Sequence, residues 1–373
     1  MKAHSDHPDV LYIVKESEDN QELRYSLRSL MNLNHKNVFF AGYKPSWAPE
    51  WVKHIPVSQH QSKYQNIRAN WLAALSSPEL SEHFILMCDD FFIMHPTKAV
   101  PVLRRLKSID HYIELFSRVD EDSYYVKTMT EAKILLEEWG IKNISSYELH
   151  VPMQFEKSKL RQLITRLPED FSTSHIRTIY GNYYNIGGRR VKDTKVINDD
   201  QAIPYDSQFL STIDESFRDG KVGEYIRRKF SNVLVFSHAN DPDGLLSVIL
   251  AQIAFAKVDY VLTNNPQTEI MDYLDNHDSS VYDAIFICDI YPGKPVLQRI
   301  PEAYWFDHKQ HSLDKILTHQ LVLPSAHIEV SHGKKKMSAS YLLYLWLLQH
   351  RLVDADIEQF VEKIRINDTW DFI

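Results

Sequence analysis

The sequence predicts two successive domains of α/β architecture, on the basis of its length, its composition and the order of its apolar segments. With 373 residues it exceeds the usual size of one hydrophobic core. Hydrophobic residues make up 44% of the chain and charged residues 25%, which is the balance of a globular protein. Apolar runs of strand length alternate with helix-like segments throughout, as they do in α/β folds.

The first half begins with a strand and an amphipathic helix. Residues 9–14 are apolar and of strand length, while Leu23, Leu27 and Leu30 recur at the spacing of one helix face. The next predicted strands are residues 38–41 and 84–88. A strand, a helix and two further strands in this order are typical of a βαβ arrangement.

The end of the first half contains a helix, a long loop and a second helical stretch. Residues 130–139 are predicted to be a helix, because Thr130 suits an N-cap and Gly140 suits the residue after a helix. Residues 180–206 are polar and rich in glycine, so we expect a long functional loop. Residues 211–229 are predicted to be helical.

The βαβ pattern starts afresh near residue 232. A strand, a helix over 245–255 and two further strands follow one another. The predicted strands are residues 233–236, 258–262 and 284–288. We therefore expect a first domain of residues 1–210, a helical linker of residues 211–230 and a second domain of residues 231–373.

Charge, cysteine content and hydropathy exclude several classes of protein. The net charge of −8 argues against extensive binding to a nucleic-acid backbone. The two cysteines, Cys88 and Cys288, form neither a disulfide framework nor a zinc-like pattern. No run reaches the ~18 apolar residues that a membrane span needs. Residues 1–8 lack the pattern of a secretory signal, so we expect a cytoplasmic protein.

A pair of carboxylates ends the strand of residues 84–88. Asp89 and Asp90 follow it directly. Two carboxylates at the end of a buried strand suit Mg²⁺ or Mn²⁺ bridging a diphosphate, because both ions prefer oxygen ligands. The alternative is a solvated turn after an edge strand.

Several segments around this pair occur in the order and spacing of the Stealth family. The strongest are EDNQELRYSLRSL (18–30) and SPELSEHFILMCDDFFIMHP (77–96), with PEWVKHIPV (49–57) between them. The segments ELHVPMQFEKSKL (148–160) and VINDDQ (196–201) resemble two later family regions, and DVLYIV (9–14) occupies the place of its first strand motif. The first motif lacks the family's Trp-Val-Asp ending, and Cys88 stands where many members have a polar residue.

The resemblance implies a domain similar to GT-A glycosyltransferases. Such a domain would transfer a sugar or a hexose 1-phosphate from a UDP-sugar to an acceptor hydroxyl. It implies that Asp89, Asp90 and Asp199 hold Mn²⁺ or Mg²⁺. Arg24 and Arg28 would face phosphate oxygens, which the bidentate guanidinium fits, and His150 would be the base that takes the acceptor proton. The alternatives are surface arginines paired with glutamates and a structural histidine.

A second set of candidate ligands lies in the second half. FSHANDPDGLLS (236–247) places His238, Asp241 and Asp243 in a turn between a strand and a helix. A histidine with two nearby carboxylates offers the mixed nitrogen and oxygen ligands that Mn²⁺ accepts. Ordinary turn chemistry of Asp, Pro and Gly is the alternative. The later candidates, each at the end of a strand or helix, are Asp289, Asp307, His308 and Asp368.

These segments resemble the four motifs of the DHH phosphoesterase family. Asp241 and Asp243 match its first motif, and AIFICD (284–289), WFDHKQH (305–311) and NDTWDF (367–372) match the next three. SASYLLYLWLL (338–348) resembles the helix before the last motif. Lys309 replaces the second histidine of the third motif and could contact a phosphate. Because the sequence ends directly after the fourth motif, we expect the family's second, substrate-binding domain to be lacking.

The two resemblances together predict a bifunctional metal-dependent enzyme. The first half would use a UDP-sugar donor and an unidentified acceptor. The second half would hydrolyse a short oligonucleotide, a nucleotide or pyrophosphate. Two alternatives remain: the second half is a nucleotide-binding module without hydrolysis, or it is the only active half.

Overall fold

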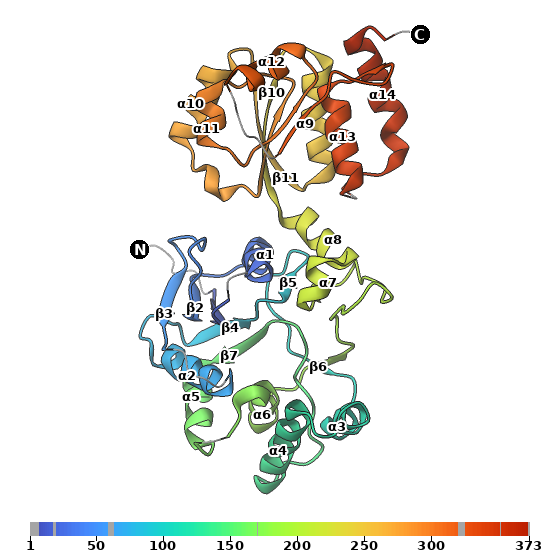
Figure 1. The fold of residues 1–373 in the computed structure, drawn as a ribbon. Coiled ribbons are helices and arrows are strands. Elements are labelled where there is room, and N and C mark those ends of the chain that lie inside the picture. Colours follow the sequence, from blue (N-terminus) through green and yellow to red (C-terminus); the bar gives the residue numbers. More distant parts are fainter. Residues whose placement is uncertain are drawn as a thin grey trace. The chain divides into compact units, whose positions relative to one another are not determined.

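The computed structural model describes residues 7–17, 20–58, 63–169, 171–319, 325–350 and 352–371. The chain divides into two compact units, residues 1–223 and 224–373 (Figure 1). The division falls inside the segment expected to be a helical linker. Each unit is described by itself.

Unit 1, residues 1–223, is built on a five-stranded mixed sheet. Its strands, in spatial order, are β3 (Lys53–Pro56), β2 (Val38–Gly42), β1 (Asp9–Val14), β4 (His83–Met87) and β7 (Met153–Glu156). The first four are parallel to one another, and β7 pairs antiparallel with β4. The strand order reverses between β1 and β4, the position at which open α/β sheets bind ligands beyond the carboxyl ends of their strands.

Both faces of this sheet are covered. On one face a core that includes Leu11, Phe84 and Phe155 packs against the apolar sides of four helices. These helices are α2 (Lys63–Ser76), α4 (Tyr124–Glu138), α5 (Lys157–Arg166) and α6 (Ile176–Tyr183). On the other face Leu23 and Leu27 of α1 (Gln21–Ser29) are buried against β1 and β4.

Smaller elements complete unit 1. They are the helices α3 (Ile109–Ser117) and α7 (Asp214–Arg218), the antiparallel pair β5 (Phe91–Ile93) and β9 (Phe209–Ser211), and the parallel pair β6 (Leu103–Arg105) and β8 (Arg189–Val191). Since β9 pairs with β5, residues 209–211 belong to the body of unit 1.

Two helix predictions were wrong in their bounds. Helix α4 begins six residues before Thr130, because the side chain of Ser123 accepts a hydrogen bond from the main-chain N–H of Val126 and caps it. Thr130 lies inside the helix, and Gly140 follows its end with φ +77° as expected. The stretch predicted as one helix over 211–229 is divided into α7 and α8 (Lys221–Phe230).

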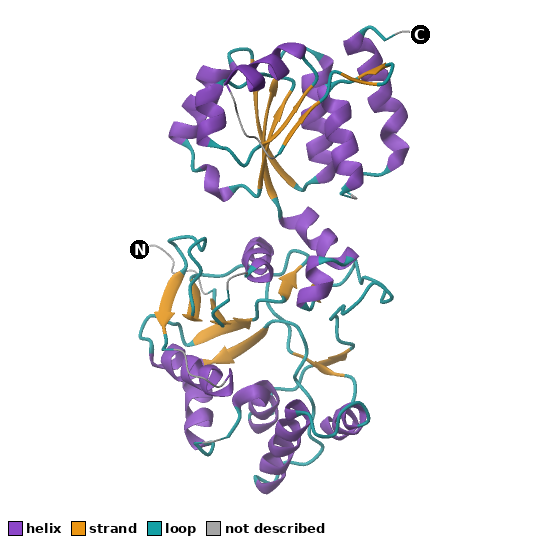
Figure 2. Cartoon of the chain, viewed as in Figure 1, coloured by secondary structure: helices purple, strands orange, loops and turns teal. Residues whose placement is uncertain are grey.

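Unit 2, residues 224–373, contains a five-stranded sheet in which every pairing is parallel (Figure 2). Its strands, in spatial order, are β11 (Lys257–Thr263), β10 (Asn232–His238), β12 (Ala284–Cys288), β13 (Tyr304–Asp307) and β14 (Ala326–Ile328). The predicted parallel α/β sheet is therefore confirmed. The strand order reverses between β10 and β12, the position at which open α/β sheets commonly bind ligands.

Helices cover both faces of the second sheet. One core lies under α9 (Pro242–Ala254), α13 (Ala339–Gln349) and α14 (Glu358–Thr369), and the other under α10 (Pro266–Asn276) and α11 (Lys294–Arg299). The remaining elements are α12 (Gln310–His319) and the short hairpin of β15 (Ser331–His332) and β16 (Lys335–Lys336). Among the described residues, no helix combines the length and apolar character needed to cross a membrane.

Candidate metal centre and a second polar site

The turn between β10 and α9 positions two carboxylates at the reversal of strand order in unit 2. Asp241 is the N-cap of α9, and its Oδ1 accepts a 2.8 Å hydrogen bond from the Gly244 N–H. Pro242 occupies the first helical turn, where its missing N–H costs nothing. A Cβ at Gly244 would lie 2.3 Å from the carbonyl oxygen of His238, so this turn requires glycine.

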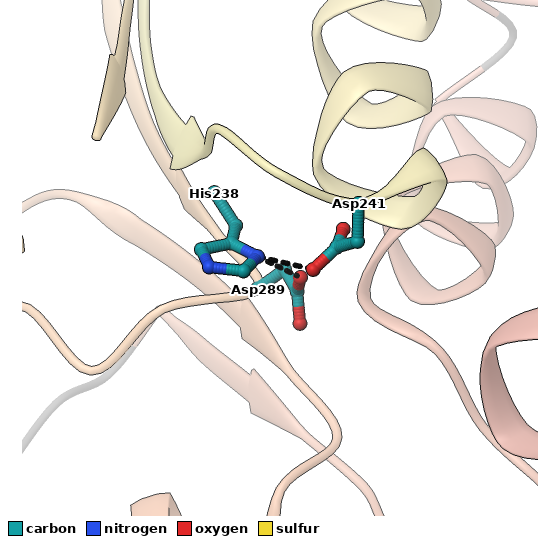
Figure 3. A group of neighbouring side chains, drawn as sticks. All are labelled: His238, Asp241 and Asp289. Atoms are coloured by element: carbon teal, nitrogen blue, oxygen red, sulfur yellow. Dashed lines mark hydrogen bonds and ion pairs between the residues drawn. The ribbon is translucent and has the colours of Figure 1, made fainter. Parts of the chain in front are cut away.

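Asp289 lies at the centre of the site. It follows β12, is 1% exposed and has φ +61°, a left-handed conformation that is uncommon for residues other than glycine and tends to occur at functional sites. Figure 3 shows its carboxylate directed toward the same place as the imidazole of His238 and the carboxylate of Asp241. His238 Nδ1 contacts Asp241 Oδ2 and lies 3.7 Å from Asp289 Oδ2. We call His238, Asp241 and Asp289 the first group.

Asp243, Asp289 and His308 form a second group. In each group, one potential ligand atom per residue lies within 4.8 Å of the others. His308 Nε2 is 3.3 Å from Asp289 Oδ1 and 3.3 Å from Asp368 Oδ2, which places Asp368 beside this group. The two groups therefore share Asp289.

Four atoms in this region lack hydrogen bonds of normal geometry within the part of the chain that the structure describes. They are both carboxylate oxygens of Asp289, Nε2 of His308 and Oδ2 of Asp368, and all four are buried. Their charged neighbours include one another and Lys309, whose Nζ lies 2.6 Å from Asp289 Oδ1. Buried polar atoms without hydrogen bonds are costly, and their convergence is typical of a cation site. These residues could therefore hold Mn²⁺ or Mg²⁺.

Helix α13 fixes the orientation of Asp243. The main-chain N–H of Ala339 donates to Asp243 Oδ2 at 2.8 Å, and the N–H and hydroxyl of Ser340 both donate to Oδ1. These donors belong to the first turn of α13, whose N-terminus carries a partial positive charge. Oδ2 accepts one of these bonds and keeps a lone pair for a cation.

Electrostatic effects in this site are large. Burial and the charge of Asp243 raise the pKa of Asp368 to about 6. Burial also raises the pKa of Asp289 despite the nearby His308 and Lys309. Burial acts to lower the pKa of His308, but the surrounding aspartates outweigh it and raise the pKa. Excess negative charge in a buried site is the condition that divalent cations relieve.

Asp307 is not brought into either group. Its Oδ1 accepts hydrogen bonds from the main-chain N–H groups of His308 and Lys309, and its Oδ2 accepts one from the Ser312 hydroxyl. These bonds hold the loop after β13 in place. Through these bonds Asp307 positions His308.

Lys309, which the sequence predicts to contact a phosphate, forms an ion pair with Asp289. Its Nζ is 2.6 Å from Asp289 Oδ1 and donates to the main-chain oxygen of the same residue at 2.6 Å. Burial acts to lower the pKa of Lys309, but the charge of Asp289 outweighs it and raises the pKa. The lysine is therefore a cation inside the acidic site.

In unit 1, Asp89 and Asp90 follow β4, at the reversal of strand order. Asp90 Oδ2 accepts hydrogen bonds from Lys195 Nζ and from the Ser211 hydroxyl, both at 3.0 Å. Glu22, in the first turn of α1, is close enough for the charges of both aspartates to act on it. Burial, with these charges, raises the pKa of Glu22 to about 8.

The other predicted residues of unit 1 have contacts of their own. Asp199 is exposed, and its Oδ1 accepts a hydrogen bond from the N–H of Lys221 at the start of α8. Arg24 lies against the ring of Trp47, and Arg28 against Tyr25. Within the described residues, neither group of potential metal ligands contains Asp89, Asp90 or Asp199, so the predicted three-aspartate metal site is not assembled.

His150 has a carboxylate partner that sequence reasoning missed. Its Nδ1 lies 2.8 Å from Asp193 Oδ2, and its main-chain N–H donates to Asp193 Oδ1 at 3.1 Å. Arg105 contacts the same carboxylate at 3.2 Å. Burial acts to raise the pKa of Asp193, but His150 and Arg105 outweigh it and lower the pKa. An ionised Asp193 favours a proton on Nδ1, which leaves Nε2 able to accept one.

Most of the residues missed from the sequence act through a partner distant in the chain. These are Glu22, Arg105, Asp193, Lys195 and Ser340. Ser312 and Ser338 were missed although their partners lie only five and three residues away. Only Ser338 carries a local signal, because a serine before an apolar helix suggests an N-cap.

Comparison with known proteins adds no assignment. No protein-family model matches the sequence, and no curated protein is significantly similar to it. Function is therefore inferred from the side chains of the two units and from the sequence motifs.

Proposed function

We propose that unit 2 is a metal-dependent phosphoesterase of the DHH type, which hydrolyses a phosphodiester or a pyrophosphate with Mn²⁺ or Mg²⁺. One observation carries this proposal: two groups of potential ligands share the buried Asp289. A shared carboxylate between two cation positions is the arrangement used to bind both the attacking and the leaving oxygen of a phosphoryl group. The position of the groups, beyond β10 and β12, supports a ligand site independently.

The residues of unit 2 divide into ligands and substrate contacts. His238, Asp241 and Asp289 would hold one ion, and Asp243, Asp289, His308 and Asp368 the other. When bound, the ions would polarise a phosphoryl oxygen and lower the pKa of the attacking water. The side chains of His238 and Lys309 are 31% and 43% exposed, so both can also reach a substrate phosphate.

Hydrolysis by the intact protein tests this proposal. Purified protein would be incubated with Mn²⁺ or Mg²⁺ and either pyrophosphate or a short oligonucleotide, and phosphate or nucleotide release would be measured. We expect Asp289→Asn to lower turnover by roughly 10²-fold or more, because both groups lose a ligand charge. Asp275→Asn, at an exposed position of α10, is the matched control and should retain activity. Equal turnover by the wild type and Asp289→Asn would contradict the proposal.

A nucleotide-binding module without hydrolysis is the second candidate for unit 2. The contact of Lys309 with Asp289 favours it, because a fixed cation in the site changes the charge available for catalysis. Calorimetry with a nucleotide in the presence of Mn²⁺ separates the two. Binding without turnover supports the module, whereas turnover supports the phosphoesterase.

For unit 1 we propose transfer of a sugar or sugar 1-phosphate from a UDP-sugar to an acceptor hydroxyl. Support comes from the ordered motifs and from His150. Asp193 holds the Nδ1 side of this imidazole, as a carboxylate does for a histidine that acts as a general base. His150 Nε2 would take the proton of the acceptor hydroxyl as its oxygen attacks the donor and the nucleotide leaves. Because Asp89, Asp90 and Asp199 do not form a group of potential metal ligands among the described residues, no metal-dependent step is assigned to unit 1.

Consumption of UDP-sugars tests the transferase proposal. The intact protein would be incubated with a panel of UDP-sugars, with and without Mn²⁺, and nucleotide release would be followed. His150→Ala should lower kcat by ~10² to 10⁴ with little change in donor binding. Loss of thermal stability with normal activity of the folded fraction would instead indicate a structural histidine.

A further inference from the structure

Lys309 occupies a specific side of the carboxylate that both groups share. The two oxygens of Asp289 face different groups, since Oδ2 is directed to His238 and Oδ1 to His308. Lys309 Nζ lies 2.6 Å from Oδ1. The ammonium is therefore on the side of the second group, while among the described residues no lysine contacts the oxygen that faces the first group.

The lysine is also held in that position by the backbone. Its Nζ donates to the main-chain oxygen of Asp289, whose φ of +61° places that residue in a left-handed turn. Asp289 is almost completely buried, so water screens the charges here only weakly. A divalent ion bound to Oδ1 would lie within a few ångströms of the ammonium and would be repelled by it.

We infer that Lys309 is a resident cation of the second group, so that this chain binds one divalent ion tightly at the first group and a second ion only weakly. A lysine ammonium carries one positive charge at neutral pH and has no lone pair to offer a metal, so it competes for Asp289 without contributing a ligand. The charge balance is consistent with this role, because Lys309 already offsets part of the charge of Asp243, Asp289 and Asp368.

Metal stoichiometry tests the inference without any assay of activity. Mn²⁺ binding to the intact, metal-free protein would be measured by calorimetry and by equilibrium dialysis. We expect one tight equivalent for the wild type and two for Lys309→Met, with the second at least about tenfold tighter than in the wild type. Electron paramagnetic resonance supplies a second readout, because two Mn²⁺ ions that share a carboxylate couple magnetically. That coupling should appear in Lys309→Met at two equivalents.

Two matched variants make the experiment specific. Lys309→Arg keeps the charge and should still bind one tight equivalent. Lys294→Met removes an exposed lysine at the start of α11 and should behave as the wild type. Lys309→Gln replaces Lys309→Met if the latter does not fold.

Because this inference rests on the proposed metal centre, the outcomes are chosen to separate the two. Two tight equivalents in the wild type, or one in both the wild type and Lys309→Met, would overturn the role of Lys309 and leave the centre intact. No Mn²⁺ binding by any of the proteins would overturn the centre itself.

Discussion

His150 is held by Asp193 through its ring and through its main-chain N–H. Replacing Asp193 by asparagine removes the charge that favours a proton on Nδ1 of His150. The tautomer of His150 with its proton on Nε2 would therefore become more populated. We expect Asp193→Asn to lower kcat for UDP-sugar turnover roughly 10- to 100-fold, with little change in KM. Nitrogen NMR of the imidazole would report the tautomer directly. Asp193→Glu, which restores the charge, should recover part of the activity.

A purely structural Asp193 would give a different result. Asp193→Asn would then lower the melting temperature while the tautomer of His150 and the kcat of the folded protein stayed as in the wild type. The NMR measurement needs no substrate, so it remains informative even if unit 1 uses a donor outside the panel.

The raised pKa of Glu22 predicts that the stability of the folded protein depends on pH. Its pKa is about 8 in the folded protein and near 4.5 when unperturbed, because burial, Asp90 and Asp89 disfavour its charge and Asp214 shares a hydrogen bond with it. Between these values the folded state keeps a proton that the unfolded chain releases. The contribution of Glu22 to the free energy of unfolding therefore falls as the pH rises from about 4.5 to about 8.

Glu22→Gln should weaken this decline, because glutamine is uncharged in both states. Chemical denaturation at about pH 5 and about pH 8 would measure the difference in unfolding free energy for each protein. Glu215→Gln, at an exposed position of α7, is the control and should follow the wild type. A steeper decline for Glu22→Gln than for the wild type would contradict the assigned direction.

At the scale of elements, the N-terminus of α13 decides how Asp243 is presented. Ser340 donates two hydrogen bonds to this carboxylate, whereas Ser338 caps the helix through the N–H of Tyr341. Ser340→Ala should weaken Mn²⁺ binding at the second group roughly 10- to 100-fold and leave the tight ion of the first group unchanged, since only the carboxylate of Asp243 loses its hydroxyl donor. Ser338→Ala should instead cost about 0.5 to 2 kcal/mol of stability. Calorimetry and thermal unfolding of both variants would distinguish the two roles.

Equal effects of the two substitutions on metal affinity would mean that helix stability, not the contact from Ser340, controls the site. Both serines lie at the N-terminus of α13, so the two substitutions form a matched pair. Both side chains are buried, so differences in exposure do not complicate it.

Sequence reasoning succeeded where the site depends on regular elements. Asp89, Asp241 and Asp289 follow strands whose apolar runs are visible in the sequence, and parallel strands end at one edge of a sheet. It failed for Asp193 and Ser340, because their partners lie 43 and 97 residues away. Such contacts depend on how loops and helices pack, and no local periodicity encodes that packing.

Asp199 and Asp307, which the motifs predict to be metal ligands, lie outside both groups of potential ligands. Both stand in acidic motifs, yet their oxygens satisfy nearby N–H groups at the start of α8 and in the loop after β13. Aspartate is common at such positions for this structural reason. Motif position alone does not separate a capping aspartate from a metal ligand.

At the scale of the whole molecule, the two proposed activities should respond to different substitutions. His150 and Asp289 lie in separate compact units, each with its own core. In the intact protein, His150→Ala should lower UDP-sugar turnover ~10²- to 10⁴-fold and leave phosphoesterase activity within a few-fold, and Asp289→Asn should do the reverse. Parallel assays of the two variants, with circular dichroism to check folding, would measure this. Loss of both activities from one substitution would indicate a shared site.

The lysine that pairs with Asp289 also bears on the order of events during biosynthesis. Small metal-dependent domains stay unfolded until they capture their ion, because their ligands have no other source of compensating charge. Here an ammonium from the chain itself supplies part of that charge. We expect folding on or after the ribosome to be complete before any manganese arrives. The newly made protein would then persist through metal starvation as an intact precursor and mature when supply returns.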